Sequence, residues 1–582
     1  MNIKTVNEIL NPFGMVEPRL NALVPDERNY KALLIQPEGN VEGSTEGVWN
    51  RDRELAQKQF KDFLDDAIST EADLVISPEY SMPWESLTAA IKEGRCPASG
   101  KLWALGCESI KYSALEALRT ALAPNVTVIF ETLEPESERF LDPLVYVFNA
   151  PGSTDEAKES TILLVQFKTH PMGDDDHFEI SGLQRGTTIY QFGGTQDSLK
   201  LVSLICSDAF AFMDADAKAV YDRALILHIQ LNRQPRHEQY RQYRVKLLQF
   251  KGHETELICL NWARNVTEWC GDKATPWKNV SASAWYLRPE NFDDRDSTIA
   301  ANHKRGLYYT WLDPQRAHTM FFNFTPAIYL IEATKVAHVG VTATISRRRG
   351  PQLRRASVWD ASALKWYEQP VANDGFSAIV NESGGASSEI KRIADSNPLW
   401  AERVLALCAG KTGHRDNWYH VQRLDSCVID SSEVIYRITF SQDVKQVARD
   451  FRIGRLKRCG HLWEILRTER LLPPALADFS QGFRFEWSPT SPHQNAMSVM
   501  GKRATVIYLG EETSADEIER VTKTTAEFLH RSFTSPDDSL TARQRLAVWF
   551  RDLNEIALYA PNRLAQYDEA RNTSEFDIAR EA

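Results

Sequence analysis

The sequence predicts an α/β protein that carries an additional α+β domain towards its C-terminal end. Between residues 30 and 345, short apolar runs typical of buried strands alternate with helix-like segments. A basic segment with glycine and proline, "SRRRGPQLRRAS" (346–357), interrupts this alternation, and a mixed pattern follows from about residue 390. The predicted divisions are an N-terminal arm (1–28), an α/β domain (29–345), a linker (346–389) and an α+β domain (390–582).

Each predicted strand of the first domain is an apolar run that ends at turn-forming or polar residues. The opening strand is followed by "WNRDRELAQKQFKDFLDDAIS", whose apolar residues recur at helical spacing between charges. In chain order, the runs are "YKALLIQPE", "ADLVISPEY", "NVTVIFETLE", "LVYVFNAPG", "TILLVQFKTH", "LKLVSLICSD", "RALILHIQL" and "ELICLNWAR". Strands covered on both faces by other layers are continuously apolar, so these runs indicate a doubly covered sheet.

The C-terminal region contains both strand and helix patterns. "EVIYRITF" alternates like a half-buried strand, and "RATVIYLG" is typical of a buried one. Ser514 with Glu517, and Thr541 with Gln544, have the spacing of capping boxes, which predicts that two helices start there. No catalytic motif is apparent in this region.

Composition excludes several classes of protein. The chain of 582 residues has a net charge of −11, which argues against general binding of nucleic acid, since phosphate contacts require a basic face. A local role for the basic segments "RRRGPQLRR" and "RQPRHEQYRQYR" stays open. Eight cysteines without a CxxC pair give no support for a zinc site. With no signal peptide and no membrane-length apolar run, a cytoplasmic protein with reduced thiols is expected.

Three strand ends of the first domain each carry one reactive side chain: Glu79, Lys168 and Cys206. Ligands in open α/β sheets bind outside the carboxyl ends of strands. A thiol, a carboxylate and an ammonium group that meet there could transfer an acyl group. The thiol would attack a carbonyl or nitrile carbon, the carboxylate would move the proton, and the ammonium would stabilise the oxyanion.

Each of these residues alone also has a purely structural explanation. A cysteine at a strand end is commonly an inert buried residue, and a glutamate after proline is commonly a solvated turn residue. A lysine after an apolar run commonly extends its ammonium group into water. The catalytic interpretation therefore depends on the order and context of all three.

That order resembles the nitrilase, or carbon–nitrogen hydrolase, superfamily over roughly residues 28–345. "ADLVISPEY" is similar to the superfamily's strand that ends in its first catalytic glutamate, and "FNAPG" with "LLVQFKTHP" to the segments that lead to its lysine. "FEISGLQRGTTIYQF" resembles the acidic segment after that lysine. "LVSLICSDAF" resembles the nucleophile elbow, and "ELICLNWARN" the later strand that ends in asparagine.

The resemblance implies a four-layer αββα sandwich and a role for each matched residue. Glu79 would be the general base, Lys168 the oxyanion stabiliser and Cys206 the nucleophile. Glu179 would be a supporting glutamate that orients the lysine. The oxyanion hole would include the backbone N–H of Ser207, while Asp208 would be structural. From its own sequence context His170 could tune the lysine, and a structural role in fixing the loop is the preferred interpretation. The expected ligand is a small-molecule amide or nitrile, no metal or cofactor is implied, and a homo-oligomer is expected.

The sequence departs from the superfamily pattern around these residues. After the elbow the chain reads "AFAFMDADA", without the usual arginine, and "LLQFKGHETE" replaces an Arg-Ala, Glu-Asn pattern. These departures leave the substrate open. They also keep a second function open: a gated effector or scaffold, for example in a bacterial defence system, whose nitrilase-like domain is regulated by the C-terminal domain or by a protein partner bound there.

One acidic loop, "GDDDHFE" (173–179), contains residue types that bind metals. No partner ligand is evident elsewhere in the sequence, so a solvated loop is the preferred interpretation. The same loop could favour a cationic substrate near Lys168.

Overall fold

The protein is described from a computed structural model, in which the chain forms two compact units, one up to residue 368 and one from residue 379. The structure describes residues 2–123, 126–134, 136, 138–154, 159–173, 177–195, 198–220, 222–233, 243, 247, 255–263, 266–277, 283–288, 307–312, 317–322, 325–337, 351–368, 379–396, 398–411, 446–488, 490–511, 513–553 and 555–559.

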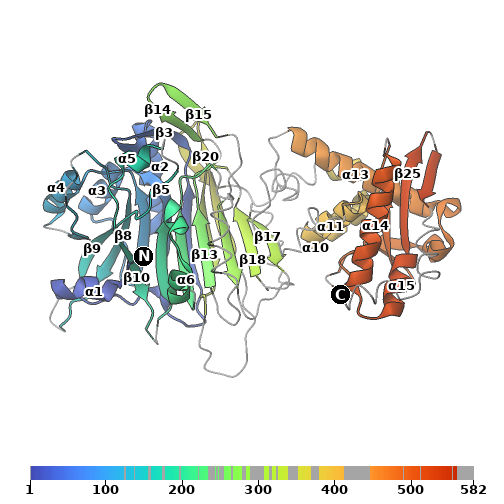
Figure 1. Cartoon of the computed structure of the whole chain (residues 1–582), viewed down its shortest axis with the longest axis horizontal. Helices are drawn as coiled ribbons and strands as arrows, with labels where there is room; N and C mark the ends of the chain where they lie inside the picture. Colours follow the sequence, from blue (N-terminus) through green and yellow to red (C-terminus); the bar gives the residue numbers. More distant parts are fainter. Residues whose placement is uncertain are drawn as a thin grey trace, which may run out of the picture. The chain divides into compact units, whose positions relative to one another are not determined.

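Two large sheets form the centre of the first unit (Figure 1). The first runs, in spatial order, β21 (Lys365–Glu368), β20 (Gln352–Asp360), β19 (Ala327–Ala333), β2 (Tyr30–Gln36), β5 (Leu74–Met82), β6 (Leu102–Cys107), β8 (Pro143–Ala150), β9 (Ser160–Phe167) and β7 (Thr127–Phe130). The second runs β1 (Asn2–Thr5), β10 (Thr188–Gly193), β11 (Lys200–Ile205), β12 (Ala224–Ile229), β13 (Thr255–Leu260), β16 (Ala284–Arg288), β18 (Ala317–Phe322) and β17 (Leu307–Leu312).

The two sheets pack face to face through side chains of β8, β9, β10 and β11. The ring of Tyr146 lies 5.1 Å from that of Phe192 in an edge contact. Gln166 donates a hydrogen bond from Nε2 to the carbonyl of Ser203 (3.0 Å) and accepts one from the backbone N–H of Tyr190 (3.0 Å). A buried amide that is satisfied by the opposite sheet fixes how the two sheets align, because leaving it unpaired would be costly.

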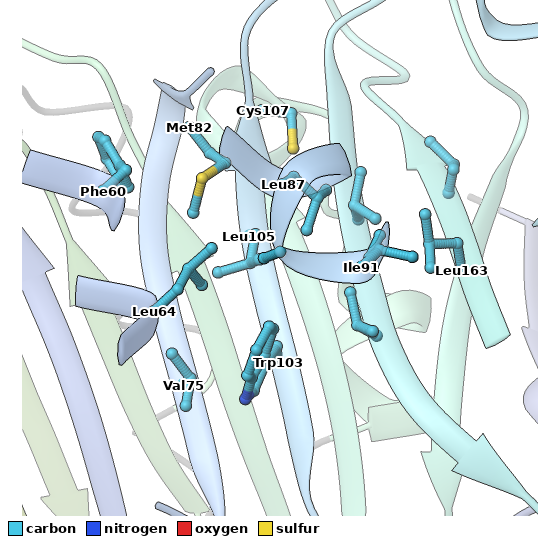
Figure 2. Packing of buried hydrophobic residues seen from close by; sticks show 14 of the residues in the cluster. Phe60, Leu64, Val75, Met82, Leu87, Ile91, Trp103, Leu105, Cys107 and Leu163 are labelled. Carbon is cyan, nitrogen blue, oxygen red and sulfur yellow. The ribbon is translucent and has the colours of Figure 1, made fainter. Parts of the chain in front are cut away.

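Helices cover the outer face of the first sheet. The helices are α2 (Arg53–Ser69), α3 (Trp84–Lys92) and α4 (Tyr112–Leu122). Figure 2 shows Phe60 and Leu64 of α2 and Leu87 of α3 among Trp103 and Leu105 of β6. These side chains are fully buried, and burying one such side chain contributes about 1.5–3 kcal/mol.

The outer face of the second sheet is covered by α6 (Asp214–Val220) and by Tyr243. Lys200 of β11 donates from Nζ to the carbonyl of Ala219 in α6 (3.0 Å), and the Tyr243 hydroxyl contacts His228 of β12. The order of layers is therefore helix, sheet, sheet, helix. The predicted four-layer αββα sandwich is confirmed.

Several strands lie outside the predicted runs, among them the central strand β6 and the last strand of the second sheet, β17. Two further segments fall in the predicted arm and linker. Asn2–Thr5, expected in an irregular arm, forms β1 and pairs in parallel with β10. Residues 352–368, expected in a linker, form β20 and β21 and extend the first sheet beyond β19. The residues of β1, β20 and β21 are in part half-buried or exposed, so these strands lack the continuous apolar run that marks a strand covered on both faces.

A smaller sheet of the first unit has the spatial order β15 (Lys273–Pro276), β14 (Val266–Cys270), β3 (Gly39–Ser44) and β4 (Gly47–Asn50). It joins the segment that follows β2 to β14, which lies far away along the chain. This sheet was not predicted, because its strands are short and largely half-buried or exposed, so they carry no continuous apolar run.

The second unit is an additional α+β region, as predicted. Its sheet has the spatial order β22 (Phe483–Phe485), β23 (Ala496–Ser498), β24 (Arg503–Tyr508), β25 (Leu546–Asp552) and β26 (Glu555–Tyr559). Alternate residues of β24 face two cores. Val506 joins a core with α10 (Ser387–Ser396), α11 (Pro398–Cys408) and α13 (Gln446–Arg467), and Ile507 joins a core with α14 (Ala515–Ser532) and α15 (Pro536–Gln544).

The capping predictions for this unit had different outcomes. Ser514 caps α14 by accepting a hydrogen bond from the N–H of Glu517 (3.2 Å), as predicted. The prediction of a helix start at Thr541 was wrong: α15 begins after Ser535, whose hydroxyl accepts from the N–H of Asp538, and ends at Gln544. Pro536 at the first helical position explains the earlier start. "EVIYRITF" lies outside the described residues.

Among the helices that the structure describes, none is both long and apolar enough to cross a membrane.

Candidate active site

Glu79 lies near the end of β5, where the backbone is forced out of the regular strand. Pairing with β6 shifts register after Ser77, and Tyr80 adopts a positive φ of 54°. A methyl group on Gly106 of β6 would lie 2.2 Å from the carbonyl oxygen of Pro78, so only glycine allows this close approach. The indole N–H of Trp262 donates to the Glu79 carbonyl (2.8 Å), which fixes the distorted backbone.

Lys168 follows β9 directly and is completely buried. Its ammonium Nζ lies 2.7 Å from Oε1 of Glu79 and 2.8 Å from Oε1 of Glu179. The backbone N–H of Leu231 donates to the other carboxylate oxygen of Glu79. Lys168 therefore does not reach water as an isolated strand-end lysine would, and the structural alternative for this residue does not hold.

Glu179 belongs to the short helix α5 (Phe178–Gly182) and is also buried. Besides the lysine, it accepts hydrogen bonds from the Tyr80 hydroxyl (3.0 Å) and from the backbone N–H of Met172 (2.6 Å). A carboxylate with three donors is held in one orientation, and it in turn holds the ammonium group of Lys168.

Cys206 stands at the turn between β11 and a short 3-10 segment (Cys206–Phe210) and has a positive φ of 39°. Such a conformation is strained for a residue with a side chain, and strain of this kind is found at functional sites. The Cys206 carbonyl contacts Nε2 of His228 at 2.8 Å. The side chain of Cys206 is buried but lines the cavity described below.

Asp208 joins the cysteine turn to the lysine loop. Its Oδ1 accepts from the N–H of Thr169 (2.8 Å) and of His170 (3.0 Å), and its Oδ2 from the N–H of Ile205 (3.1 Å). The Ser207 hydroxyl donates to the carbonyl of His170 (2.6 Å). The structural roles of Asp208 and His170 stay predictions, and these bonds are compatible with them. The use of the Ser207 N–H in an oxyanion hole stays a prediction.

One cavity of about 860 Å³ brings the predicted catalytic residues together. Glu79, Lys168, Glu179 and Cys206 all line it. The small sheet supplies another wall, through residues of β3, β4, β14 and β15. Much of the remaining lining is apolar or aromatic: Val41, Val48, Tyr80, Met172, Phe178, Leu231 and Trp269. Of the acidic loop, residues 174–176 lie outside the described residues.

Sequence reasoning missed Asp142, which precedes β8 and is fully buried. Its Oδ2 lies 3.5 Å from Nζ of Lys168, and its carbonyl accepts a hydrogen bond from the Lys168 N–H (3.0 Å). The signal in the sequence is weak, because an aspartate before proline is typical of a turn. The buried apolar residues Phe140 and Leu141 just before it were the available clue.

Burial and the single positive charge determine the protonation of this cluster. Burial raises the pKa of Glu79, although the Lys168 charge acts against the increase. For Glu179, burial is outweighed by the Lys168 charge and by hydrogen bonds, so its pKa is lowered. Burial would lower the pKa of Lys168, but the charges of Glu179, Glu79 and Asp142 raise it well above its usual value. Lys168 is therefore a permanent cation at neutral pH.

The chain was also compared with known proteins. No family model matches it, and no curated protein matches it. Solved structures to which it is similar include an amidase from Nesterenkonia sp., with 13% identity and a TM-score of 0.26 over 45% of this chain and 84% of that chain. Another is Saccharomyces cerevisiae Nit3, a member of branch 10 of the nitrilase superfamily, with 13% identity and a TM-score of 0.25 over 44% and 82%.

A third similar structure is a glutamine-dependent NAD+ synthetase from Acinetobacter baumannii, with 12% identity and a TM-score of 0.25 over 66% of this chain and 53% of that chain. At these identities and TM-scores, the matches say nothing of the activity or substrate of this chain.

Proposed function

We propose that this chain is a cysteine-dependent hydrolase that cleaves a non-peptide carbon–nitrogen bond, as an amidase does. One observation carries the proposal: a single cavity is lined by Cys206, Lys168, Glu79 and Glu179. In it, the ammonium group of Lys168 donates hydrogen bonds to both glutamates. Burying a lysine in this way costs desolvation energy, and buried titratable groups that share a cavity are typical of functional sites.

In the first half of the reaction, the Cys206 sulfur attacks the carbonyl carbon of the substrate, and Glu79 accepts the thiol proton. The tetrahedral intermediate carries a negative oxygen, which Lys168 and the backbone N–H of Ser207 stabilise. As the carbon–nitrogen bond breaks, Glu79 returns the proton to the departing nitrogen. Ammonia or an amine leaves, and a thioester remains on Cys206.

In the second half, Glu79 accepts a proton from a water molecule that attacks the thioester. The carbon–sulfur bond breaks, the thiol of Cys206 is restored by the proton from Glu79, and a carboxylic acid leaves. The same carboxylate serves both halves because it is fixed on one side by Lys168 and on the other by Leu231. Glu179 acts through Lys168, whose position it maintains.

The proposed substrate is a small amide with an apolar group next to the reacting carbon. The aromatic and aliphatic side chains Tyr80, Phe178, Trp269 and Leu231 line the cavity and favour such a group. Lys273 and Arg233 also line the cavity, and Arg233 is paired with Glu268 (3.1 Å).

The test combines a panel of amides with intact-mass spectrometry of the full chain. Wild-type protein should release ammonia or an amine and should show a transient acyl adduct on Cys206. Cys206→Ala should lose both, and Cys96→Ala, a matched change at a partly buried cysteine outside the cavity, should keep both. Undiminished turnover by the Cys206→Ala variant would refute the proposal.

A gated effector or scaffold is the second candidate. The observation in its favour is that the second unit has its own sheet and two cores of its own, so it can respond independently to a ligand or protein partner. In this proposal the first unit hydrolyses its substrate only in one state of the second. Substitutions confined to the second unit test this proposal through their effect on turnover.

A further inference from the structure

Asp142 is a third buried carboxyl group beside the lysine, and the proposed reaction gives it no role. It is fully buried, and Pro143, the next residue, starts β8 opposite the end of β9. Carboxylate oxygens of Glu79, Asp142 and Glu179 all lie within 4.8 Å of one another. Lys168, with Nζ 3.5 Å from Asp142 Oδ2, supplies the cation of this cluster.

The hydrogen bonds around the three carboxyl groups are unevenly distributed. Glu79 accepts from Lys168 and from the N–H of Leu231, and Glu179 accepts from Lys168, Tyr80 and the N–H of Met172. Among the residues that the structure describes, no N–H or O–H group donates a hydrogen bond to either side-chain oxygen of Asp142. An ionised carboxylate buried without a donor is strongly disfavoured.

The charges of the cluster also disfavour an ionised Asp142. If all three carboxyl groups were ionised, three negative charges would face the single positive charge of Lys168. Among the described residues, the other titratable groups that face Asp142 are the Tyr80 hydroxyl and the Cys107 thiol. Burial raises the pKa of each well above its usual value, so both are neutral. Burial, followed by the charge of Glu79, likewise raises the pKa of Asp142 well above its usual value.

We propose that Asp142 is a positioning residue that stays protonated at neutral pH and donates a hydrogen bond to Glu79. Protonated Asp142 can donate a hydrogen bond, and Glu79 can accept it. Ionised Asp142 could only accept hydrogen bonds, and no described group donates one to its side chain. The pair then holds one proton, which resides on Asp142 and leaves Glu79 ionised. The catalytic role of Asp142 rests on the proposed function. The protonation state of Asp142 does not, because it is a property of the protein without substrate.

In the reaction, the two neighbouring carboxyl groups would have different roles: Glu79 transfers protons, and Asp142 keeps Glu79 ionised and in place. Burial alone favours protonation of Glu79, which would prevent it from accepting the thiol proton of Cys206. A hydrogen bond from protonated Asp142 stabilises the ionised form of Glu79 and fixes its orientation. Proton transfer in the reaction still runs between Cys206, Glu79 and the leaving group, while the Asp142 proton stays in place.

Infrared spectroscopy of the full chain tests the protonation state without any substrate. A protonated carboxylic acid absorbs at a frequency distinct from carboxylates and shifts in heavy water. The difference spectrum, wild type minus Asp142→Asn, should show this band at neutral pH. The band should persist, at a shifted position, in Glu79→Gln, where Asp142 would donate to the amide oxygen instead.

A matched control is Asp478→Asn. Burial acts to raise the pKa of Asp478, but its hydrogen bonds to Arg545 outweigh burial and lower that pKa, so Asp478 is ionised and this change should leave the band intact. A band that survives in Asp142→Asn and disappears in Glu79→Gln would overturn the proposal, and so would a wild-type spectrum without the band. If Asp142→Asn fails to fold, Asp142→Leu, which removes the acid and fills the space, replaces it in the difference spectrum.

The positioning role has a separate kinetic test. The amide side chain introduced by Asp142→Asn keeps an N–H donor for Glu79, whereas Asp142→Leu removes the donor and still fills the space. With an amide that wild-type protein hydrolyses, kcat should fall about tenfold or more in Asp142→Leu relative to Asp142→Asn, and KM should change little. Equal kcat values for the two variants would overturn the positioning role. Absence of turnover in all variants, wild type included, would refute the proposed function and leave the infrared result standing.

Discussion

Lys168 is the residue on which the other polar groups of the site depend. It is fully buried, and two glutamates and an aspartate surround its ammonium group. Removing one partner from a buried ion pair costs about 3–5 kcal/mol, because the remaining charge is left uncompensated. The cluster therefore holds together chain segments that meet only in the folded protein, and each of its members constrains the protonation of the others.

The raised pKa of Asp142 predicts a specific dependence of stability on pH. Folding raises this pKa above its ordinary value of 3.8, so between the two values the folded state binds more protons at Asp142 than the unfolded state. Its contribution to the free energy of unfolding is therefore present at low pH and is lost as pH rises through this window. Denaturant titrations measure the free energy of unfolding of wild type and of Asp142→Asn at each pH. The difference, wild type minus variant, should fall by up to about 1.4 kcal/mol for each unit that the pH rises.

The opposite trend, a difference that grows as pH rises from 3.8, would show that Asp142 is ionised in the folded protein. Glu179 provides an internal contrast, since its pKa is lowered on folding. Its contribution is present above the ordinary value and is lost as pH falls through the folded value. The two carboxyl groups can therefore be separated by the direction of their effects.

At the scale of the elements, the position of Glu79 depends on the irregular end of β5, where the regular pairing with β6 breaks off. The carbonyl of Pro78 and the Cα atom of Glu79 lie so close to Gly106 of β6 that no side chain fits there. Asp208 then ties the cysteine turn after β11 to the loop after β9. Strand ends supply the chemical groups, and these two contacts between elements set the distances between them.

Replacing Gly106 tests this dependence. In Gly106→Ala, the added methyl group would lie 2.2 Å from the Pro78 carbonyl oxygen and 2.8 Å from the Glu79 Cα atom, so β5 must shift. We expect a loss of about 1–3 kcal/mol in the free energy of unfolding, together with a fall in kcat. Thermal unfolding and amide turnover measure the two effects.

Gly454→Ala is the matched control, because a methyl group there meets no atom within 4 Å in the helix α13. It should keep wild-type turnover and should unfold at the wild-type temperature or slightly above, since alanine favours helices more than glycine. Wild-type turnover in Gly106→Ala would show that the position of Glu79 does not depend on this contact.

At the scale of the whole molecule, the chain combines a four-layer unit that holds the site with a second unit that has its own cores. Gating by the second unit, the second candidate function, predicts that a change confined to that unit alters turnover. Arg545 is suitable because its guanidinium group makes paired hydrogen bonds with Asp478, at 3.0 Å each.

In Arg545→Ala, the second unit loses this ion pair, which costs about 1.5–3 kcal/mol for hydrogen bonds between charged groups. If the second unit gates the first, kcat for an amide should change, and the rate at which a saturating substrate acylates Cys206 should change in the same direction. Arg484→Ala, at an exposed residue of the same unit, is the control and should have no effect. Unchanged turnover in Arg545→Ala would argue for independent units.

The fold class and the residues of the site could be predicted because both leave local signatures. Continuous apolar runs marked the doubly covered strands, and the motifs around Glu79, Lys168 and Cys206 identified the residues that the cavity brings together. Several strands were missed: β1, β20 and β21 lie at or near sheet edges and lack such runs, and the central strand β6 was missed although it is buried throughout. The helix start at Thr541 was misplaced because Ser535 and Pro536 provide a stronger start signal.

Only the tertiary structure decided the protonation and the grouping of the buried charges. Asp142 is separated by 26 residues from Lys168 and by 63 from Glu79 along the chain, and its own sequence context indicates a turn. The sequence around each of these residues does not indicate that three carboxyl groups surround one ammonium group. Apolar periodicity is a property of neighbouring residues, whereas a pKa depends on the charges and solvent that the folded chain places around a group.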